Sequence, residues 1–429
     1  MVRIRFTMLS LLLTILLAIC AASSMAQART NVIVGDSATA NTTLHYSDSH
    51  LSASSAITAT WSTSVIDDSG SGGAIAIDAA DQLHISYFRN VDSYSAEVRI
   101  ARRENDSWQF ETVPQNVEPV SVGAVTSLAI DEQVYDHVAS IWYTNWTQTA
   151  YYATNANGEA WTEPTLLDYV PSAISIAIAT DINGHAHITY CTQNAQTLDR
   201  ELWYVDMLPD GMVWIKTPVG EEGCWYSTSL SVNVNNEPQI AYYAADFEDQ
   251  TGILKFASRV GRVWRIETVD DTGDAGRGLS LAVAEDGTPH IGYLYTDPDA
   301  DVDQFEVRYA TRSDDTWRID TLATISGNLD FGSGPAIALD RLGQPHLAYY
   351  DQQARVIVYG RYAGGGWEQT DAIETANASL SPRALTLDSS DMPHLTYSSR
   401  TEGQVYATVE PSTPGEPQQQ KVYLPQFHN

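Results

Sequence analysis

The stretch AIALDRLGQPHLAY, from Ala336 to Tyr349, decides how this chain folds, because its pattern returns along the sequence. A close copy, AIAIDAADQLHISY, runs from Ala74 to Tyr87. Each copy alternates small and large residues, passes through a polar turn that begins with aspartate, and ends in His-aliphatic-small-Tyr. An alternation with period two is typical of β-strands. Each copy therefore predicts two antiparallel strands joined by a turn.

Two columns of residues extend this pattern over most of the chain. The histidine of the motif recurs at His84, His137, His187, His290, His346 and His394. His137 lies one residue early in its copy, and in one further copy Gln239 takes the place of the histidine. A tryptophan recurs about every fifty residues, at Trp61, Trp108, Trp161, Trp214, Trp264, Trp317 and Trp367. A repeat of this length that contains only strand patterns is typical of a β-propeller. The sequence therefore predicts an all-β fold with seven units.

Each unit contains four strand candidates, which in the fifth unit are 279–283, 290–295, 305–310 and 317–321. The chain begins with a lone fourth strand around Trp61 and ends with three strands, 384–388, 394–397 and 404–409. We therefore predict seven four-stranded antiparallel blades, with the N-terminal strand completing the C-terminal blade. Closing the ring in this way leaves no open sheet edge.

The Asp–His pairs at the turns, such as Asp78/His84, Asp340/His346 and Asp388/His394, could serve as acid–base dyads or metal ligands. A catalytic site needs one dyad, however, whereas these pairs recur with the blades. We interpret them as structural: the aspartate fixes the turn, and the histidine fills the gap between blades and bonds a neighbouring backbone.

A second motif is a glycine three residues before the tryptophan, at Gly158, Gly211, Gly261 and Gly364. The fullest copy, TNANGEAW from Thr154 to Trp161, resembles the Asp-box of sialidase-like (BNR-repeat) propellers, with Ala156 where that motif has aspartate. The resemblance implies a secreted bacterial propeller. A sialidase site also needs an arginine triad with a Tyr/Glu pair. Only Arg277 and Arg383 lie near first strands, so no catalytic residues are carried over from the family.

The alternating strand direction places the loops between strands two and three, and those between blades, on one rim. Cys191 and Cys224 fall on this rim, and we predict that they form a disulfide. The acidic loop 297–303 also falls there. Its alternating carboxylates Asp297, Asp299, Asp301 and Asp303 suit Ca²⁺, although a solvated acidic loop explains them equally. We expect no obligatory cofactor.

Aromatic residues on the same rim are candidates for stacking against sugar rings beside hydrogen-bonding groups. The predicted ligand-binding residues are Trp225, Tyr226, Tyr243, Tyr295 and Tyr350. A catalytic site should break the repeat, and the least repetitive polar residues are therefore the best catalytic candidates. They are His185, Tyr243, Asp246 and Arg277.

Composition and the chain ends limit the possible partners. With 54 Asp and Glu against 23 Lys and Arg, the net charge is −31, which argues against binding nucleic acid. Residues 1–28 have the features of a signal peptide, 29–58 form a Ser/Thr-rich arm, 59–410 the propeller, and 411–429 a Pro/Gln-rich linker and tail. No segment beyond the signal is long and apolar enough to span a membrane. We expect a monomer that is secreted or held at the cell surface.

These features favour a non-catalytic module that binds a glycan or an extracellular protein on the loop-rich rim and at the central opening. A polysaccharide-active enzyme, either a sialidase-like hydrolase or a lyase, is the alternative. A structural cell-surface scaffold is a third class.

Overall fold

The computed structural model describes residues 60–92, 95–104, 107–114, 121–144, 147–156, 160–170, 175–194, 196–207, 213–220, 223–245, 251–299, 304–313, 316–327 and 333–409. In these residues all regular structure is β-strand, and no helix of membrane-spanning length and hydrophobicity occurs. The predicted signal peptide, the arm and the C-terminal tail lie outside the described residues.

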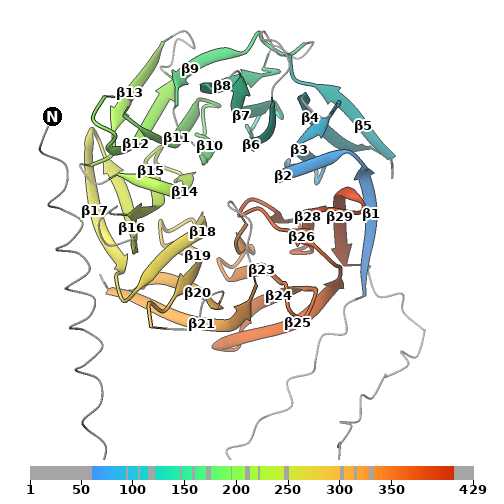
Figure 1. Cartoon of the computed structure of the whole chain (residues 1–429), viewed down its shortest axis with the longest axis vertical. Helices are drawn as coiled ribbons and strands as arrows, with labels where there is room; N and C mark the ends of the chain where they lie inside the picture. The colour runs from blue at the N-terminus through green and yellow to red at the C-terminus, as the bar shows by residue number, and fades with distance from the viewer. Residues whose placement is uncertain are drawn as a thin grey trace, which may run out of the picture. The chain divides into compact units, whose positions relative to one another are not determined.

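The strands form seven antiparallel sheets that are arranged as the blades of a propeller (Figure 1). Blade 1 contains β2 (Gly70–Ile77), β3 (Leu83–Asn90), β4 (Ala96–Glu104) and β5 (Ser107–Thr112), and blade 2 contains β6 (Ser121–Ile130), β7 (Asp136–Thr144), β8 (Thr147–Thr154) and β9 (Thr165–Tyr169). Blade 3 contains β10 (Ile176–Thr180), β11 (Ala186–Gln193), β12 (Arg200–Met207) and β13 (Trp214–Pro218), and blade 4 contains β14 (Cys224–Val232), β15 (Pro238–Ala245), β16 (Gly252–Val260) and β17 (Val263–Asp270). Blade 5 contains β18 (Asp274–Val283), β19 (Pro289–Thr296), β20 (Gln304–Ser313) and β21 (Thr316–Ser326), and blade 6 contains β22 (Ala336–Leu339), β23 (Pro345–Asp351), β24 (Val356–Ala363) and β25 (Gly366–Glu374). Blade 7 combines β26 (Ala378–Ser379), β27 (Leu385–Leu387), β28 (Pro393–Ser399) and β29 (Gly403–Val409) with β1 (Trp61–Asp67).

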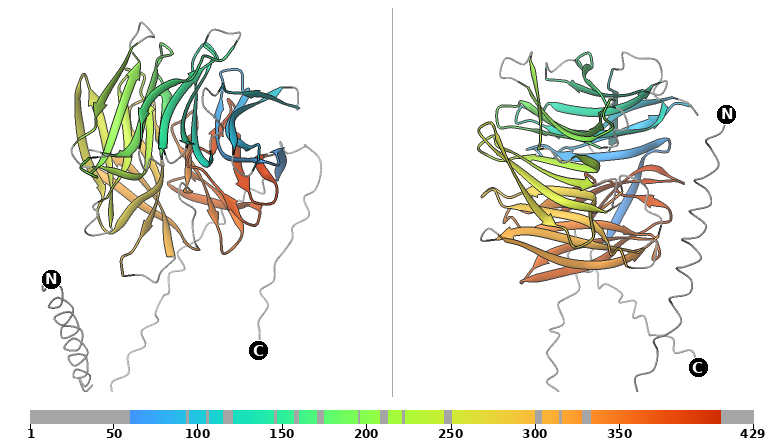
Figure 2. Two further views of the ribbon diagram at one scale, coloured as in Figure 1. Left: turned by 45° about the horizontal axis from the view of Figure 1, so that its top comes forward. Right: turned by 60° about the vertical axis from the view of Figure 1, so that its left-hand side comes forward.

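The ring closes in blade 7, where the first strand of the chain pairs with the last (Figures 1 and 2). The antiparallel register joins Trp61 to Val409 and Ser64 to Tyr406. The predicted closure is confirmed. Because β1 covers the edge of β29, blade 7 has a fourth, outer strand as the other blades do, and β29 leaves no unpaired edge.

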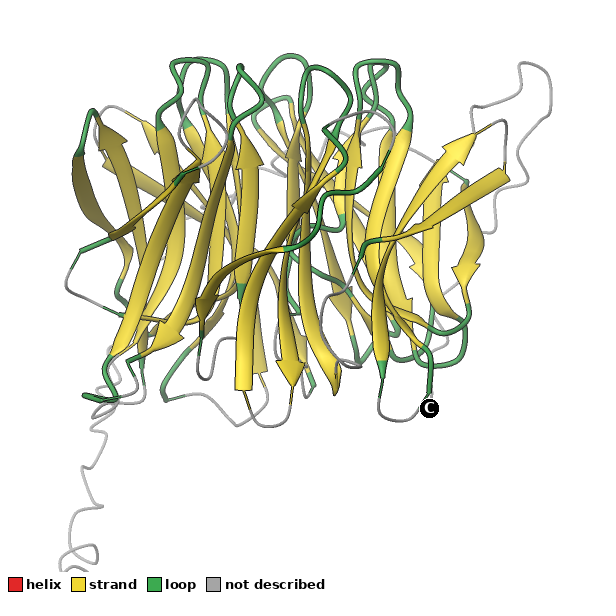
Figure 3. Cartoon of the chain, turned by 90° about the horizontal axis from the view of Figure 1, so that it is seen from above, coloured by secondary structure: helices red, strands yellow, loops and turns green. Residues whose placement is uncertain are grey.

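The strands run between two rims of the ring (Figure 3). We call "connection rim" the side with the loops between strands two and three and between blades, such as 271–273 between blades 4 and 5. We call "turn rim" the side with the turns between strands one and two and between strands three and four, such as 284–288 in blade 5 and 261–262 in blade 4. This division follows from the strand order within each sheet.

Neighbouring blades are joined near the axis by serine side chains. The Oγ atoms of Ser127, Ser229 and Ser280 accept hydrogen bonds from the backbone N–H of the next blade's first strand, at 3.1–3.3 Å. These first strands are the inner edges of their sheets, so their outward N–H groups have no strand partner. The small residues predicted there as thin spacers therefore also satisfy backbone donors.

Blade 7 departs from the repeat, because its first strand is split into β26 and β27. The backbone between them reaches the inner strands of three other blades. Ile75 N of blade 1 donates to Arg383 O at 3.0 Å, Ser280 Oγ of blade 5 donates to Pro382 O at 2.6 Å, and an Arg383 Nη2 donates to Ile176 O of blade 3. We call residues 381–384 the axial plug. It crosses the centre of the ring, where the sequence predicted an opening available for ligand binding.

Candidate functional site

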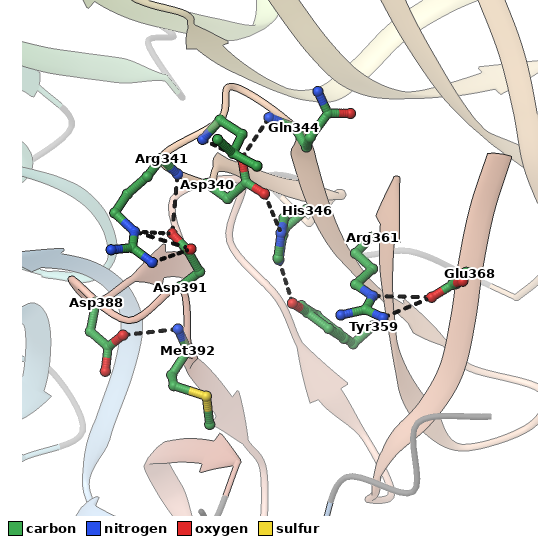
Figure 4. Close-up of polar contacts among 11 residues, drawn as sticks. Asp340, Arg341, Gln344, His346, Tyr359, Arg361, Glu368, Asp388, Asp391 and Met392 are labelled. Atoms are coloured by element: carbon green, nitrogen blue, oxygen red, sulfur yellow. Dashed lines mark hydrogen bonds and ion pairs between the residues drawn. The ribbon is translucent and has the colours of Figure 1, made fainter. Parts of the chain in front are cut away.

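Five of the six recurring histidines are bonded to tyrosines rather than to backbone groups, and the sixth, His84, is bonded to Asp136 of blade 2 at 2.7 Å. In five blades the histidine Nδ1 is hydrogen-bonded to a tyrosine hydroxyl on the third strand of the same blade; the pairs are His137–Tyr152, His187–Tyr204, His290–Tyr309, His346–Tyr359 and His394–Tyr406. Figure 4 shows one of these pairs, with Asp340 on the other side of the His346 ring. These histidines therefore have the predicted structural role, but they bond a tyrosine hydroxyl and not the neighbouring backbone group that was expected.

The aspartates fix the turns, as predicted. Asp340 Oδ1 accepts from the backbone N–H groups of Leu342 and Gln344 at 2.8 and 2.7 Å, and Asp78, Asp131, Asp181 and Asp388 repeat this pattern. Burial lowers the pKa of His187, His346 and His394, and lowers that of His290 to about 4. These histidines are therefore neutral at pH 7, and the Nδ1 atom of each is hydrogen-bonded to its tyrosine.

A pocket opens on the connection rim between blades 5, 6 and 7. Its volume is about 60 Å³, which is space for a few water molecules or one edge of a larger ligand. Leucine, isoleucine and proline side chains form much of its wall, and its polar lining includes Ser333, Tyr349, Gln352, Asn377 and Arg400. The mixture of an apolar wall with a few polar groups is common in ligand sites.

Local chain geometry builds this pocket. Gly334 lies in its lining, and a Cβ atom there would lie 2.0 Å from the carbonyl oxygen of Gly278. Only glycine permits this close approach between blades 5 and 6. Tyr350 Oη accepts from the backbone N–H of Asn377 at 3.0 Å and donates to Thr375 O at 3.3 Å, which holds the segment that enters blade 7.

The lining supplies no acid–base pair for cleaving a glycosidic bond. Its one charged side chain is Arg400, and the described residues that line it include no carboxylate or histidine. Tyr349 donates to Gln369 Oε1 at 2.9 Å, and burial raises its pKa to about 12. Glycosidases usually require two carboxyl groups about 5 to 9.5 Å apart. The described lining of this pocket does not contain such a pair.

Two of the predicted catalytic residues meet elsewhere on the connection rim. Tyr243 donates to Asp274 Oδ1 at 2.5 Å, and an Arg277 Nη2 lies 2.7 Å from Asp274 Oδ2. Burial, together with Asp274, raises the pKa of Tyr243, so this phenol remains protonated and donates a hydrogen bond. His185 lies on the opposite rim, where it is bonded to Asp181, and Asp246 lies outside the described residues.

The predicted aromatic ligand residues are more buried than the sequence suggested. The exposed fractions of Tyr243, Tyr295 and Tyr350 are 2%, 6% and 7%. These rings therefore offer little surface for stacking, although Tyr350 does line the pocket. Trp225 is partly buried, with the Arg200 guanidinium carbon 4.9 Å from its ring centre. The side chain of Tyr226 lies outside the described part of the structure.

The predicted calcium loop is described only in part. Asp297 Oδ1 accepts from the backbone N–H of Asp299 at 2.9 Å, whereas Asp301 and Asp303 lie outside the described residues. Elsewhere in the described ranges, no group of three or more His, Cys, Asp or Glu side chains could hold a metal ion. Calcium binding at this loop stays a prediction.

The predicted disulfide is confirmed. Cys191 on β11 and Cys224 on β14 are bonded, with their Cα atoms 5.3 Å apart and both side chains buried. The bond therefore ties blade 3 to blade 4 at the connection rim.

Sequence reasoning missed the polar pocket residues Gln352, Asn377 and Arg400, and it missed Asp274. Asn377 has a positive φ of 58°, which asparagine tolerates better than most residues. The signal in the sequence that could have pointed to this site was an asparagine next to the irregular start of the last unit. The tyrosines that bond the histidines also recur about every fifty residues, but they are hard to distinguish among 23 tyrosines.

Comparisons with known proteins find only distant likenesses. No family model and no curated protein sequence matches the chain. Among solved structures, the chain is similar to the SapL1 lectin in complex with α-methyl fucoside, at 15% identity and a TM-score of 0.47, over 71% of this chain and 97% of that one. It is similar to the polysaccharide lyase Uly1, at 11% identity and a TM-score of 0.48, over 79% of this chain and 89% of that one. It is also similar to the NanB sialidase from Streptococcus pneumoniae, at 10% identity and a TM-score of 0.43, over 81% of this chain and 69% of that one. The architecture follows from the structure itself: its seven antiparallel sheets, each with four main strands, make the chain a seven-bladed β-propeller.

Proposed function

We propose that this protein is an exported propeller that binds the edge of a glycan in the pocket between blades 5, 6 and 7, without cleaving it. The observation that carries this proposal is the lining of the pocket. It combines amide, hydroxyl and guanidinium groups with an apolar wall, and it includes no carboxylate or histidine among its described residues. Sugars present hydroxyl groups beside apolar C–H faces, so this mixture matches their chemistry.

The test is a glycan array with the exported form of the protein, followed by calorimetric titration of the strongest hit. Arg400→Ala and Gln352→Ala should each weaken binding about 10-fold, the effect of losing about 1.4 kcal/mol. Leu342→Ala is the matched control, because Leu342 is 83% exposed on the turn rim. Binding that survives both pocket substitutions would place the glycan elsewhere. The absence of any binding glycan would favour an extracellular protein partner or a scaffold.

An enzyme is the second candidate, and the cluster of Tyr243, Asp274 and Arg277 favours it. This cluster does not recur with the blades, and the Arg277 side chain is 39% exposed. A hydrolase and lyase screen with the same glycans tests this alternative. The enzyme alternative would be supported if the protein turns over a glycan, and if Tyr243→Phe abolishes this turnover while binding in the pocket persists.

A further inference from the structure

The axial plug places an arginine at the centre of the ring with little to neutralise it. Arg383 Nη2 donates to the carbonyl oxygen of Ile176, and among the described residues this is the one hydrogen bond of its guanidinium. The Nε atom is covered and has no hydrogen-bond partner in the described part of the chain. A guanidinium has five N–H donors, so most of them are available to a further acceptor.

Arg383 lies at the axis of the ring, is partly buried and is still charged. Burial lowers its pKa to about 10, which leaves it protonated at pH 7. A buried cation that no carboxylate pairs with is costly, because transfer out of water is not offset by an opposite charge. By contrast, the buried Arg102 and Arg308 side chains contact Asp136 and Asp270.

The surroundings of Arg383 allow a ligand and limit its size. Its side chain is only partly buried, so part of it remains accessible to solvent. At the same level, the plug backbone is bonded to the inner strands of blades 1 and 5 at 3.0 and 2.6 Å. The plug backbone therefore lies close to these inner strands, which favours a small ligand over a large one.

We propose that Arg383 forms a binding site for a small monovalent anion of about the size of chloride at the axis of the propeller. The anion accepts hydrogen bonds from the free N–H groups of the guanidinium and neutralises it. In this arrangement the anion stabilises the closed ring, because the plug that it supports contacts blades 1, 3 and 5. The site is separate from the glycan pocket on the connection rim.

Bromide is the probe, since it replaces chloride and scatters X-rays anomalously. Crystals soaked in sodium bromide should show an anomalous peak within hydrogen-bond distance of the Arg383 guanidinium. The thermal unfolding midpoint should rise by about 2 °C or more, and saturate, as bromide replaces the larger gluconate anion at constant ionic strength.

Arg383→Met should abolish the bromide dependence of the midpoint, and Arg383→Lys should retain part of it. Arg265→Gln, on the exposed face of β17, is the control and should behave as the wild type does. If Arg383→Met does not fold, the crystal soak of the wild type decides. Equal midpoints in bromide and gluconate, with no anomalous peak at Arg383, would overturn the proposal.

Discussion

Single side chains join each blade to the next. The tyrosine that bonds the histidine also packs edge-on against a tryptophan of the following blade; Tyr204 and Trp264, for example, have ring centres 5.2 Å apart with an interplanar angle of 77°. In blade 4, where Gln239 replaces histidine, Phe256 replaces the tyrosine and still packs against Trp317. The hydroxyl is thus present in five of the six blades that have the histidine, and is absent in blade 4, which has none. In blade 1 Ile100 stands at this position, and His84 Nδ1 is bonded to Asp136 of blade 2 instead.

Removing one of these hydroxyl groups should destabilise the fold. Tyr309→Phe leaves His290 Nδ1, which now lies 2.6 Å from the hydroxyl, buried without this partner. We expect a loss of about 2 kcal/mol in the free energy of unfolding, measured by urea denaturation. The control is Tyr169→Phe, because Tyr169 is 66% exposed and should change stability by less than about 0.5 kcal/mol. Equal effects of the two substitutions would contradict the structural role of the pair.

Stability should fall in mild acid. The pKa of His290 is about 4 in the folded protein against 6.5 in the unfolded chain. The unfolded chain therefore takes up the proton first, and stability is lost as the pH falls from about 6.5 to about 4. For His290 alone the loss is about 3 kcal/mol, and burial of His187, His346 and His394 acts in the same direction. Urea titrations between pH 7 and 4 measure this, and His290→Gln should flatten the dependence.

At the scale of strands, the serine bonds between inner edges can be compared with one another. Ser280 bonds both Ile337 N and the plug carbonyl of Pro382, whereas Ser229 bonds Leu281 N alone. Ser280→Ala should therefore destabilise the protein by about 2 kcal/mol and Ser229→Ala by about 1 kcal/mol. Chemical denaturation of the two variants measures the difference, and a larger loss for Ser229→Ala would exclude a stabilising contact between Ser280 and the plug.

The disulfide joins strands of different blades, and its loss should be costly. In the chain-entropy model, the 33-residue separation of Cys191 and Cys224 corresponds to about 3 to 4 kcal/mol. The Cys191→Ser/Cys224→Ser double variant should unfold at a correspondingly lower urea concentration. Thiol labelling of the unreduced protein should find neither Cys191 nor Cys224 free. Labelling of both would show that the bond does not form in solution.

Strand periodicity allowed most elements to be predicted, because alternation in the sequence directly reflects the two faces of a strand. In unit five, all four predicted ranges fall within β18 to β21. Trp161 is an exception: it precedes β9, and Pro164 lies between them, where a proline cannot donate to a strand ladder. The split of blade 7 and the pocket beside it could not be predicted, since both depend on contacts between segments far apart in the sequence, such as Arg383 with Ile176.

At the scale of the whole molecule, the ring depends on a strand of seven residues. Deleting residues 60–67 would remove β1, expose the backbone edge of β29 and remove Trp61 from its contact with Tyr359 in blade 6. We expect this variant to aggregate or to lose its cooperative thermal transition. A chain that begins at residue 60 is the control. Addition of a peptide with the sequence 60–67 should restore folding in part, and a deletion variant that folds like the control would show that closure is dispensable.

The register of that closing pair also governs how the protein bears mechanical load. Trp61, the start of β1, is paired with Val409, the end of β29. The chain therefore enters and leaves the ring at the same pair of hydrogen-bonded residues. Tension between the two ends would act on the Trp61–Val409 pair first and then separate the other residue pairs of β1 and β29 one after another, as in unzipping. Tension on one end alone would not load the pair in this way. The propeller is therefore suited to being tethered by a single terminus and poorly suited to serve as a link in a chain under strain.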